Sequence, residues 1–301
     1  MIGACRRGGG PAIVDAVAAG WTAAARRLAL ALAAAVLLGG CTGGRDARTS
    51  PAAPEAPGKA AWRRLAPAPS ERTEVAATAV GTLVYVVGGF RDDGTTVPTV
   101  EVYDTRQDRW RRGPDLPEAR AAGTAVALDG RLYVAGGVAP GGLAGAMLVY
   151  DPTARRWSTA PGPPTRREHL GGAGYGGRVY TVGGRARGRG DFTAAEAFNP
   201  GTGQWVRLPD LPTRRGGLAA AATGNGFVVA VGGEATTTFE EAETFDARVG
   251  AWSSLPPLPT PRHGLGVVAV GTVLYALAGG PRPGLHVSGA AEAIDLAPLR
   301  P

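Results

Sequence analysis

Residues 130–157 read G-R-L-Y-V-A-G-G-V-A-P-G-G-L-A-G-A-M-L-V-Y-D-P-T-A-R-R-W, and the main parts of this stretch recur along the chain. Glycine doublets recur in steps of 48, 47, 49 and 47 residues, at Gly88-Gly89, Gly136-Gly137, Gly183-Gly184, Gly232-Gly233 and Gly279-Gly280. Tryptophans recur in steps of 48, 47, 48 and 47 residues, at Trp62, Trp110, Trp157, Trp205 and Trp252. An aromatic residue precedes the last four tryptophans by seven positions, at Tyr103, Tyr150, Phe198 and Phe245. A period of this length is typical of a propeller or a solenoid.

Each repeat contains four short strand signals. In the second repeat these are residues 120–128, 131–135, 147–150 and the segment around Trp157, with a hairpin turn expected at Asp129-Gly130. The glycine doublets lack a Cβ and are expected to let the backbone approach a neighbouring blade. The recurring tryptophans could be sugar-stacking platforms, but their fixed place in every repeat favours packing between sheets. The pattern therefore predicts an all-β propeller.

These residues resemble kelch repeats, in which a hydrophobic strand ends in Gly-Gly and is followed by a tyrosine and then a tryptophan. The resemblance extends from Trp62 to about Ala297. Two local departures are Val229 in place of the strand tyrosine and Tyr275, which lies four residues before its glycine doublet instead of three. The latter suggests a bulge or a register change in the fifth blade. The resemblance implies a β-propeller, commonly of six or seven blades.

The fifth repeat contains no outer tryptophan strand, and the chain begins its repeats with that missing piece, Trp62-Arg63-Arg64-Leu65. Pairing this segment with the last three strands would remove an exposed sheet edge. We therefore predict a five-bladed kelch-type β-propeller closed by an N-terminal outer strand. An open ring or a missing blade is the alternative.

The N-terminal residues read as an export signal. Arg26-Arg27 precede an apolar run of eleven residues, Leu28–Leu38, which is too short to span about 30 Å of hydrocarbon as a helix. The ending Gly39-Gly40-Cys41 resembles the bacterial lipobox, in which the cysteine is acylated; an ordinary signal with an incidental thiol is the alternative. The long n-region suggests a true start downstream of Met1.

Three segments are thus expected: a signal peptide at 1–40, a lipidated Cys41 with a flexible linker at 41–61, and the propeller at 62–301. The predicted location is the outer face of the bacterial cell membrane, with the lipid as the only membrane contact. Of the formal net charge of +7, +3 falls on residues 62–301, which hold 25 Arg against 22 Asp or Glu. With so little excess charge on the body and no basic run, we expect no nucleic-acid partner.

One recurring charged position suggests a binding face. Arginines precede the first strand of every repeat, at Arg72, Arg120, Arg167, Arg215 and Arg262. If they ring one mouth of the channel, together with His169 and His263, they would suit carboxylates or phosphates on a ligand. The loops that follow the glycine doublets would open on the same face, at residues 90–99, 138–145, 185–192, 234–238 and 281–287.

A structural role for these arginines is the competing interpretation. Recurring glutamates lie two residues before the third-strand aromatic or isoleucine and are natural partners, at Glu101, Glu196, Glu243 and Glu292. Leu148 breaks this series in the second repeat.

Enzymatic interpretations are weaker, and no catalytic residues, cofactor or metal site are assigned. Copper chemistry like that of galactose-oxidase propellers needs a thioether cysteine, and residues 62–301 contain no cysteine. His169 and His263, two histidines without a carboxylate cluster, are a poor metal site. The predicted function is an envelope-anchored binding or scaffold module for a protein or glycan. The alternative is a sugar mutarotase or epimerase on the same face, with Glu168 and His169 as acid and base.

Overall fold

The computed structural model describes residues 66–299 except 278, 285, 287 and 289, with the side chains of Leu277 and Ala291 left out. The chain divides into two units, Met1–Ala61 and Trp62–Pro301. All described residues lie in the second unit. The expected signal peptide, Cys41 and the closing segment Trp62–Leu65 lie outside the described residues. None of the described residues is helical, and so this part of the chain contains no helix able to cross a membrane.

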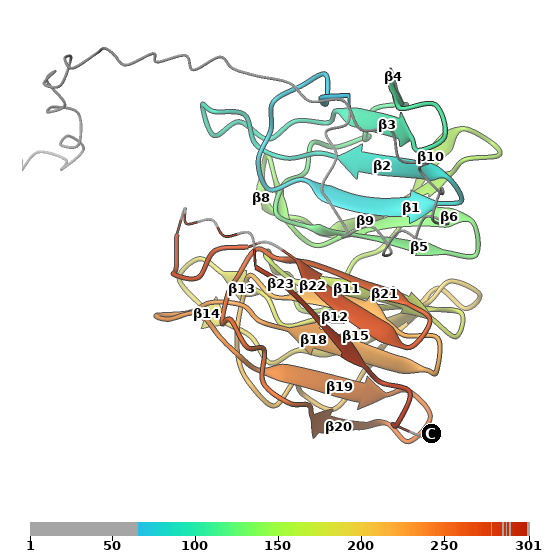
Figure 1. Cartoon of the computed structure of the whole chain (residues 1–301). Helices are drawn as coiled ribbons and strands as arrows, with labels where there is room; N and C mark the ends of the chain where they lie inside the picture. Colours follow the sequence, from blue (N-terminus) through green and yellow to red (C-terminus); the bar gives the residue numbers. More distant parts are fainter. Residues whose placement is uncertain (1–65, 278, 285, 287, 289, 300–301) are drawn as a thin grey trace, which may run out of the picture. The chain divides into compact units, whose positions relative to one another are not determined.

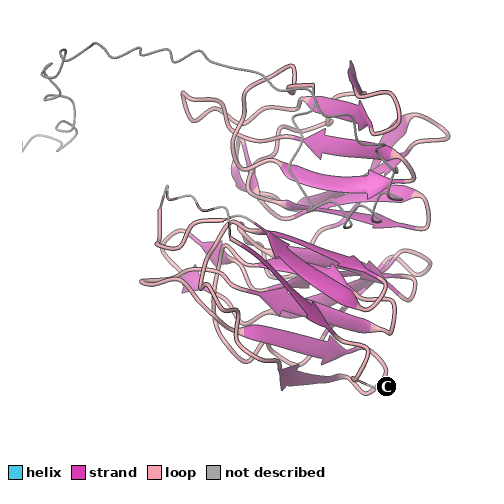
Figure 2. Cartoon of the chain, viewed as in Figure 1, coloured by secondary structure: helices cyan, strands magenta, loops and turns pink. Residues whose placement is uncertain are grey.

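The described chain folds into consecutive antiparallel sheets (Figures 1 and 2). Blade 1 consists of β1 (Ala76–Val80), β2 (Leu83–Val87), β3 (Val100–Asp104) and β4 (Arg109–Arg112). Blade 2 consists of β5 (Thr124–Leu128), β6 (Arg131–Ala135), β9 (Ala146–Asp151) and β10 (Arg156–Pro161). Blade 3 consists of β11 (Gly171–Tyr175), β12 (Arg178–Val182), β15 (Ala195–Asn199) and β16 (Gln204–Arg207). Blade 4 consists of β17 (Ala219–Ala222), β18 (Phe227–Val231), β19 (Ala242–Asp246) and β20 (Ala251–Ser254).

Blade 5 has three described strands, β21 (Gly266–Val270), β22 (Val273–Leu277) and β23 (Ala291–Asp295). Two small hairpins project from the loops that follow glycine doublets, β7 (Val138–Ala139) with β8 (Gly142–Leu143) and β13 (Arg185–Ala186) with β14 (Gly190–Asp191). The first strands of successive blades contact one another in the order β1, β5, β11, β17, β21. The five sheets form a five-bladed β-propeller, which confirms the predicted fold class. Closure by Trp62–Leu65 stays a prediction.

The hairpin turns follow from local sequence. Asp129 and Gly130 both have positive φ, at 49° and 75°, as the tight turn between β5 and β6 requires. Along the strands, alternate side chains enter the spaces between blades, where the core is located. Between blades 1 and 2, for example, Tyr85 and Val102 pack against Leu132 and Tyr150.

The glycine doublets lie where one blade meets the next. A Cβ on Gly88 would lie 1.9 Å from the carbonyl oxygen of Arg120 in blade 2. The next residue, Gly89, donates its N–H to that same oxygen at 2.7 Å. Equivalent bonds of 2.9 Å join Gly137 to Arg167, Gly184 to Arg215 and Gly233 to Arg262. The missing side chains therefore permit a backbone contact that repeats at four interfaces.

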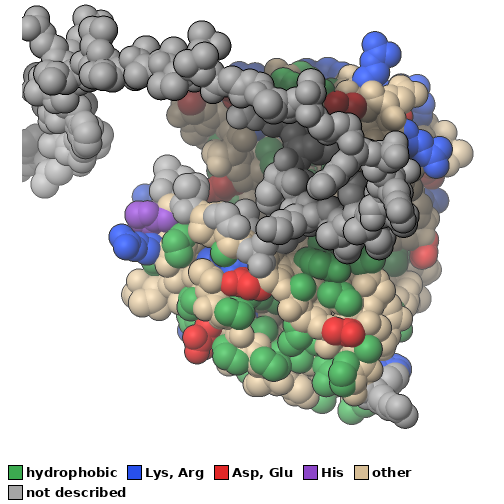
Figure 3. Space-filling view, viewed as in Figure 1, with side chains coloured by type: hydrophobic (Ala, Val, Ile, Leu, Met, Phe, Trp, Pro, Cys, Tyr) green, Lys and Arg blue, Asp and Glu red, His purple; other side chains and the backbone are tan. Residues whose placement is uncertain are grey.

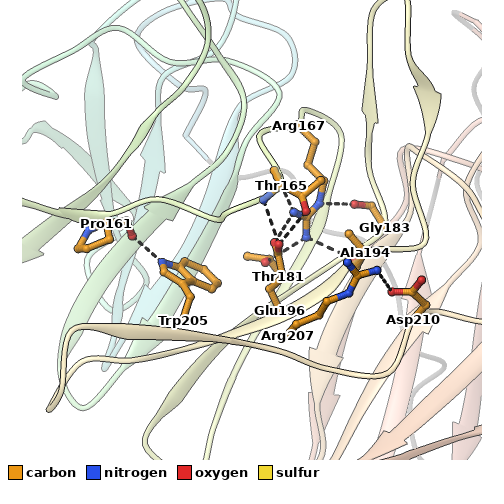
Figure 4. Close-up of polar contacts among 10 residues, drawn as sticks. All are labelled: Pro161, Thr165, Arg167, Thr181, Gly183, Ala194, Glu196, Trp205, Arg207 and Asp210. Carbon is orange, nitrogen blue, oxygen red and sulfur yellow. Dashed lines mark hydrogen bonds and ion pairs between the residues drawn. The ribbon is translucent and has the colours of Figure 1, made fainter.

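The recurring aromatics form pairs at the outer edges of the blades. Ring centroids lie 4.9 to 5.3 Å apart in Tyr103–Trp110, Tyr150–Trp157, Phe198–Trp205 and Phe245–Trp252. Each indole Nε1 donates to a backbone carbonyl near the start of the segment that leads into its own blade; Trp205, for example, donates to Pro161, the last residue of β10, at 2.7 Å (Figure 4). These tryptophans are half-buried, and both the apolar body and the polar tip of each side chain have partners.

The fifth repeat has no bulge in β22. Tyr275 pairs with Val268 in an unbroken register, as Tyr85 pairs with Thr78 in blade 1. Gly280 forms the isolated bridge, to His263, that Phe90 forms with Thr73. The glycine doublet of this repeat is therefore displaced by one residue, and Gly279 is the counterpart of Gly89. This corrects the bulge or register change suggested by the sequence.

Replacing Gly88 by alanine should destabilise the propeller more than replacing Gly130, although both glycines have positive φ, at 65° and 75°. A Cβ on Gly130 meets nothing within 4 Å. We expect Gly130→Ala to lower the free energy of unfolding by about 1–2 kcal/mol through backbone strain alone. Gly88→Ala should lower it by at least about 2 kcal/mol more, because overpacking against a carbonyl adds to that strain. Denaturant unfolding of both variants measures this, and equal losses would contradict it.

Candidate functional site

The five recurring arginines are buried inside the blades. Their side chains are 0–3% exposed, and each forms an ion pair. Arg72 pairs with Glu101 at 2.7 Å, Arg167 with Glu196 at 2.6 Å and Arg215 with Glu243 at 2.5 Å. Arg262 pairs with Glu292. In blade 2, where Leu148 stands at the glutamate position, Arg120 instead pairs with Glu118 at 2.7 Å.

Each guanidinium also binds backbone carbonyls of its own blade. Arg167 donates to the carbonyls of Gly183 at 2.5 Å and Thr165 at 2.7 Å, and to the hydroxyl of Thr181 at 3.1 Å (Figure 4). Burial lowers the pKa of Arg167, and the charge of Glu196 opposes that shift. The expected arginine-lined face is therefore absent, because these side chains are buried inside the blades and paired with carboxylates there. The structure shows the competing arrangement, in which arginines and glutamates hold the strands of each blade together.

A hydrogen-bonded series of backbone groups runs past the arginines. The residues two positions after them all have positive φ, between 51° and 65°: Glu74, Ala122, His169, Gly217 and Gly264. The N–H of each donates to the carbonyl of the preceding one at 2.8 to 3.0 Å, from Ala122 through to Gly264. Glycine is the least strained residue in this conformation, so Glu74 and His169 occupy it at an energetic cost.

A cavity of about 780 Å³ opens at this end of the blades, and we call it the mouth cavity. Its lining comes from all five blades: the segments just before the first strands, and the loops after the glycine doublets of blades 3 to 5. All three histidines of the chain line it, together with Glu74, Arg185 and Glu234. Of the expected site residues, His169 and His263 therefore lie in the cavity, whereas the five arginines do not.

The charged side chains of the mouth cavity form a connected network. Arg185 Nη1 lies 2.7 Å from Glu234 Oε1, and Arg185 Nη2 lies 3.2 Å from His169 Nε2. His169 Nε2 also lies 3.3 Å from Glu74 Oε2, so that blade 1 is linked to blade 3. Glu234 continues the network into blade 5, with its Oε2 lying 3.5 Å from His263 Nδ1 and accepting the Gly284 N–H at 3.2 Å.

Electrostatics favour the charged form of His169. Burial alone would lower its pKa, but the carboxylates of Glu168 and Glu74 outweigh burial and raise the pKa from 6.5 to about 9. In turn, His169 lowers the pKa of Glu74. The cavity thus presents an imidazolium beside carboxylates at neutral pH. Among the described residues, no group of three or more His, Cys, Asp and Glu side chains is placed to hold a metal ion.

Sequence reasoning did not single out Glu74, Arg185 or Glu234. A signal was available, since Glu74 occupies the position of His169 within the repeat. Arg185 and Glu234 both directly follow a glycine doublet, and each pairs with the residue after the buried arginine of its blade. Other repeats have Ala122, Val138 or glycines at the equivalent positions. Charged residues at these positions therefore mark where a repeat departs from the purely structural pattern.

Fold and site together define a β-propeller with a polar cavity at the end where its blades begin. Residues 74–280 match the family model described as "KLHDC2/KLHL20/DRC7 Kelch-repeats domain". The chain belongs to the kelch-repeat family, which confirms the resemblance seen in the sequence.

Individual relatives match over parts of the chain. Kelch-like protein 34 of Homo sapiens is 30% identical over 158 residues, which cover 52% of this chain and 24% of that protein. Kelch-like protein 40 of Xenopus laevis is 32% identical over 83 residues, 28% of this chain and 13% of that protein. The chain thus matches less than a quarter of the length of these relatives. A solved structure described as "Structure of YjhT" has a TM-score of 0.67 and 16% identity, covers 78% of this chain and 85% of that one, and shows the fold alone.

Replacing His169 by asparagine tests the network. Asparagine tolerates positive φ, so the backbone is kept while the charge is lost. Because the folded pKa is raised, the proton on His169 stabilises the fold fully below about pH 6.5, and this contribution is lost as the pH rises through about 9. We expect His169→Asn to lower the free energy of unfolding by about 2 kcal/mol at pH 6 and by much less at pH 10. Urea unfolding across this pH range measures it.

Replacing the exposed His286 by asparagine is the matched control for the substitution itself. A loss at His169→Asn that stays constant from pH 6 to pH 10 would contradict the assigned ion pairs.

Proposed function

We propose that this chain is an exported, lipid-anchored binding or scaffold module that recognises a protein or glycan of the cell envelope at the mouth cavity. Kelch propellers are typical protein-interaction modules, and the family match extends over most of the propeller. The export signal and the lipobox-like Cys41 support a location at the outer face of the bacterial cell membrane. In this proposal the lipid makes the only membrane contact, and nucleic acid is not a partner.

The observation that carries this proposal is the mouth cavity, with its charged network drawn from different blades. Glu74 and His169 accept strained backbone positions there, although Gly217 and Gly264 at equivalent positions show that the fold does not need these side chains. Side chains kept at such a cost are candidates for function. The cavity is also the place where loops of different length meet on a rigid scaffold.

The charges of the network are already paired with one another. Arg185 faces Glu234 and Glu168, while His169 faces Glu74. A hydroxyl- or amide-rich ligand could therefore exchange hydrogen bonds with these groups without separating an ion pair, whereas a strongly anionic ligand would meet the carboxylates. This favours glycans or polar peptide segments over free phosphates.

A sugar isomerase at the same cavity is the second candidate. One feature favours it: His169 lies beside the carboxylates of Glu74 and Glu168, which raise its pKa to about 9 and so favour its protonated form at neutral pH. A proton donor and proton acceptors are therefore adjacent in a cavity, as general acid–base catalysis requires.

Glu234→Gln tests the cavity as the binding site. The change is nearly isosteric and removes the charge that pairs with Arg185 and faces His263. We expect the amount captured by crosslinking pull-down from the native envelope, and the affinity for immobilised glycans, to fall at least about tenfold. A tenfold fall in affinity corresponds to a loss of about 1.4 kcal/mol of binding free energy. Glu240→Gln is the matched control, since Glu240 is exposed and does not line the cavity.

Equal capture by the two variants would exclude the mouth cavity as the binding site. If the purified chain instead accelerates the interconversion of sugar anomers, followed by NMR, and His169→Asn abolishes that exchange, the isomerase is favoured over the binding module.

Cys41→Ser tests the anchor. Without a thiol to acylate, the chain should move from the membrane fraction to the soluble fraction of the exported proteins, because no other membrane contact is proposed. Intact-mass analysis of the membrane-bound wild type should show an acylated N-terminus at Cys41. An unacylated N-terminus beyond residue 41 would contradict the proposal.

A further inference from the structure

The interface between blades 5 and 1 differs from the other four. At each of those four, two backbone hydrogen bonds join the blades: one from a residue of the glycine doublet, and one in the series through the positive-φ residues. By the repeat, the fifth interface would have bonds from Gly279 to Arg72 and from Glu74 to Gly264. All four residues are described, and neither bond is formed. We call this interface the seam.

The wall that blade 5 contributes to the seam is apolar and exposed. Tyr275 is 36% exposed, whereas the tyrosines at the same strand position of blades 1 to 3 are 2–4% exposed. Val268 is 51% exposed, against 3% for Val126 at its position in blade 2. Val270, on the same face of the sheet, is 67% exposed. Hydrophobic side chains lie at the surface over blade 5 in Figure 3.

The wall that blade 1 contributes is less buried than its counterparts. Val84 and Val86 are half-buried, whereas Leu132 and Val134 at the same positions of blade 2 are 0–1% exposed. Val75 is 36% exposed, although the leucines at its position in blades 3 to 5 are 4–6% exposed. Both sides of the seam therefore present apolar surface that is buried at the equivalent places elsewhere in the propeller.

The seam opens into the mouth cavity, because Glu74, Gly264 and Gly279 line both. On the blade-1 side, the Glu74 N–H and the Arg72 carbonyl have no hydrogen-bond partner among the described residues. On the blade-5 side, the same is true of the Gly279 N–H and the Gly264 carbonyl. Each side thus offers one backbone donor and one backbone acceptor, which are the groups that bind an extended peptide when it adds to a sheet.

We propose that the seam binds an extended polypeptide segment of an envelope partner, whose apolar side chains pack on the two walls. The inference rests on the proposed function and narrows it, since it names the kind of partner that enters from the mouth cavity. An extended polypeptide supplies alternating N–H and carbonyl groups together with apolar side chains. A glycan supplies hydroxyls, but no side chains that would cover Val268, Val270 and Tyr275. The exposed carboxylates of Glu74 and Asp295 favour basic residues in the segment.

Val268→Asn in the full chain tests the seam. The probe is a fluorescein-labelled heptapeptide of alternating valine and threonine with a lysine at each end, and fluorescence anisotropy measures its affinity. We expect the affinity to fall at least about tenfold, because the change replaces apolar wall surface by an amide and leaves the charge unaltered. Val249→Asn is the matched control, since Val249 is 74% exposed in the turn between β19 and β20 of blade 4.

Two results would overturn the proposal: equal affinities of the wild type and Val268→Asn, or no binding of the peptide up to about 1 mM. Glu234→Gln separates this failure from failure of the proposed function. If Glu234→Gln lowers capture of envelope partners or glycans while Val268→Asn changes nothing, the mouth cavity is the binding site and the seam is not.

Photo-crosslinking to the unmodified chain does not depend on how the variants fold. The same peptide carries a benzophenone at its central position, and peptide mass spectrometry locates the crosslinks. We expect them within residues 73–86 and 264–276, which form the two walls. Crosslinks confined to the mouth-cavity loops, at residues 185–192 and 234–238, would exclude the seam and leave the mouth cavity as the site.

Discussion

A buried guanidinium beside a glycine carbonyl is the contact on which the geometry of the blades depends. In blade 3 the Arg167 side chain binds the Gly183 carbonyl and Glu196, while its backbone carbonyl accepts the N–H of Gly137 from blade 2. One residue thus fixes both the strands of its own blade and the distance to its neighbour. Because a buried charge is tolerated only when it is fully paired, neither the arginine nor the glycines can change independently.

This architecture leaves the residues that follow the arginine free to vary. Their backbone groups form the hydrogen-bonded series from Glu74 to Gly264, so their conformation is set by the main chain. The side chains at these positions, together with those after the glycine doublets, reach the mouth cavity. Recognition chemistry can therefore change in one blade without disturbing the contacts that hold the others.

The fold could be predicted from the sequence because the glycine doublets and the tryptophans recur at the same period, and every copy supports the same assignment. Less of the site could be predicted. Spacing showed that the five arginines are equivalent, but not whether they point into the blade or toward a ligand. The glutamate series indicated the buried arrangement, because each of its members provides an ion-pair partner for the arginine of its own blade. These are Glu101, Glu196, Glu243 and Glu292. The links from Glu74 to His169 and from Arg185 to Glu234 join separate blades, and a single sequence contains no signal for such pairing.

Blade 2 departs from the pattern in a way that affects its response to dissolved ions. Leu148 replaces the buried glutamate, and Arg120 turns to Glu118, whose side chain is 47% exposed against 3–21% for the partners in the other blades. Counterions screen exposed charges far more than buried ones. Among the five buried arginines, Arg120 therefore has the ion pair that is most sensitive to ionic strength, and concentrated salt would weaken that pair first.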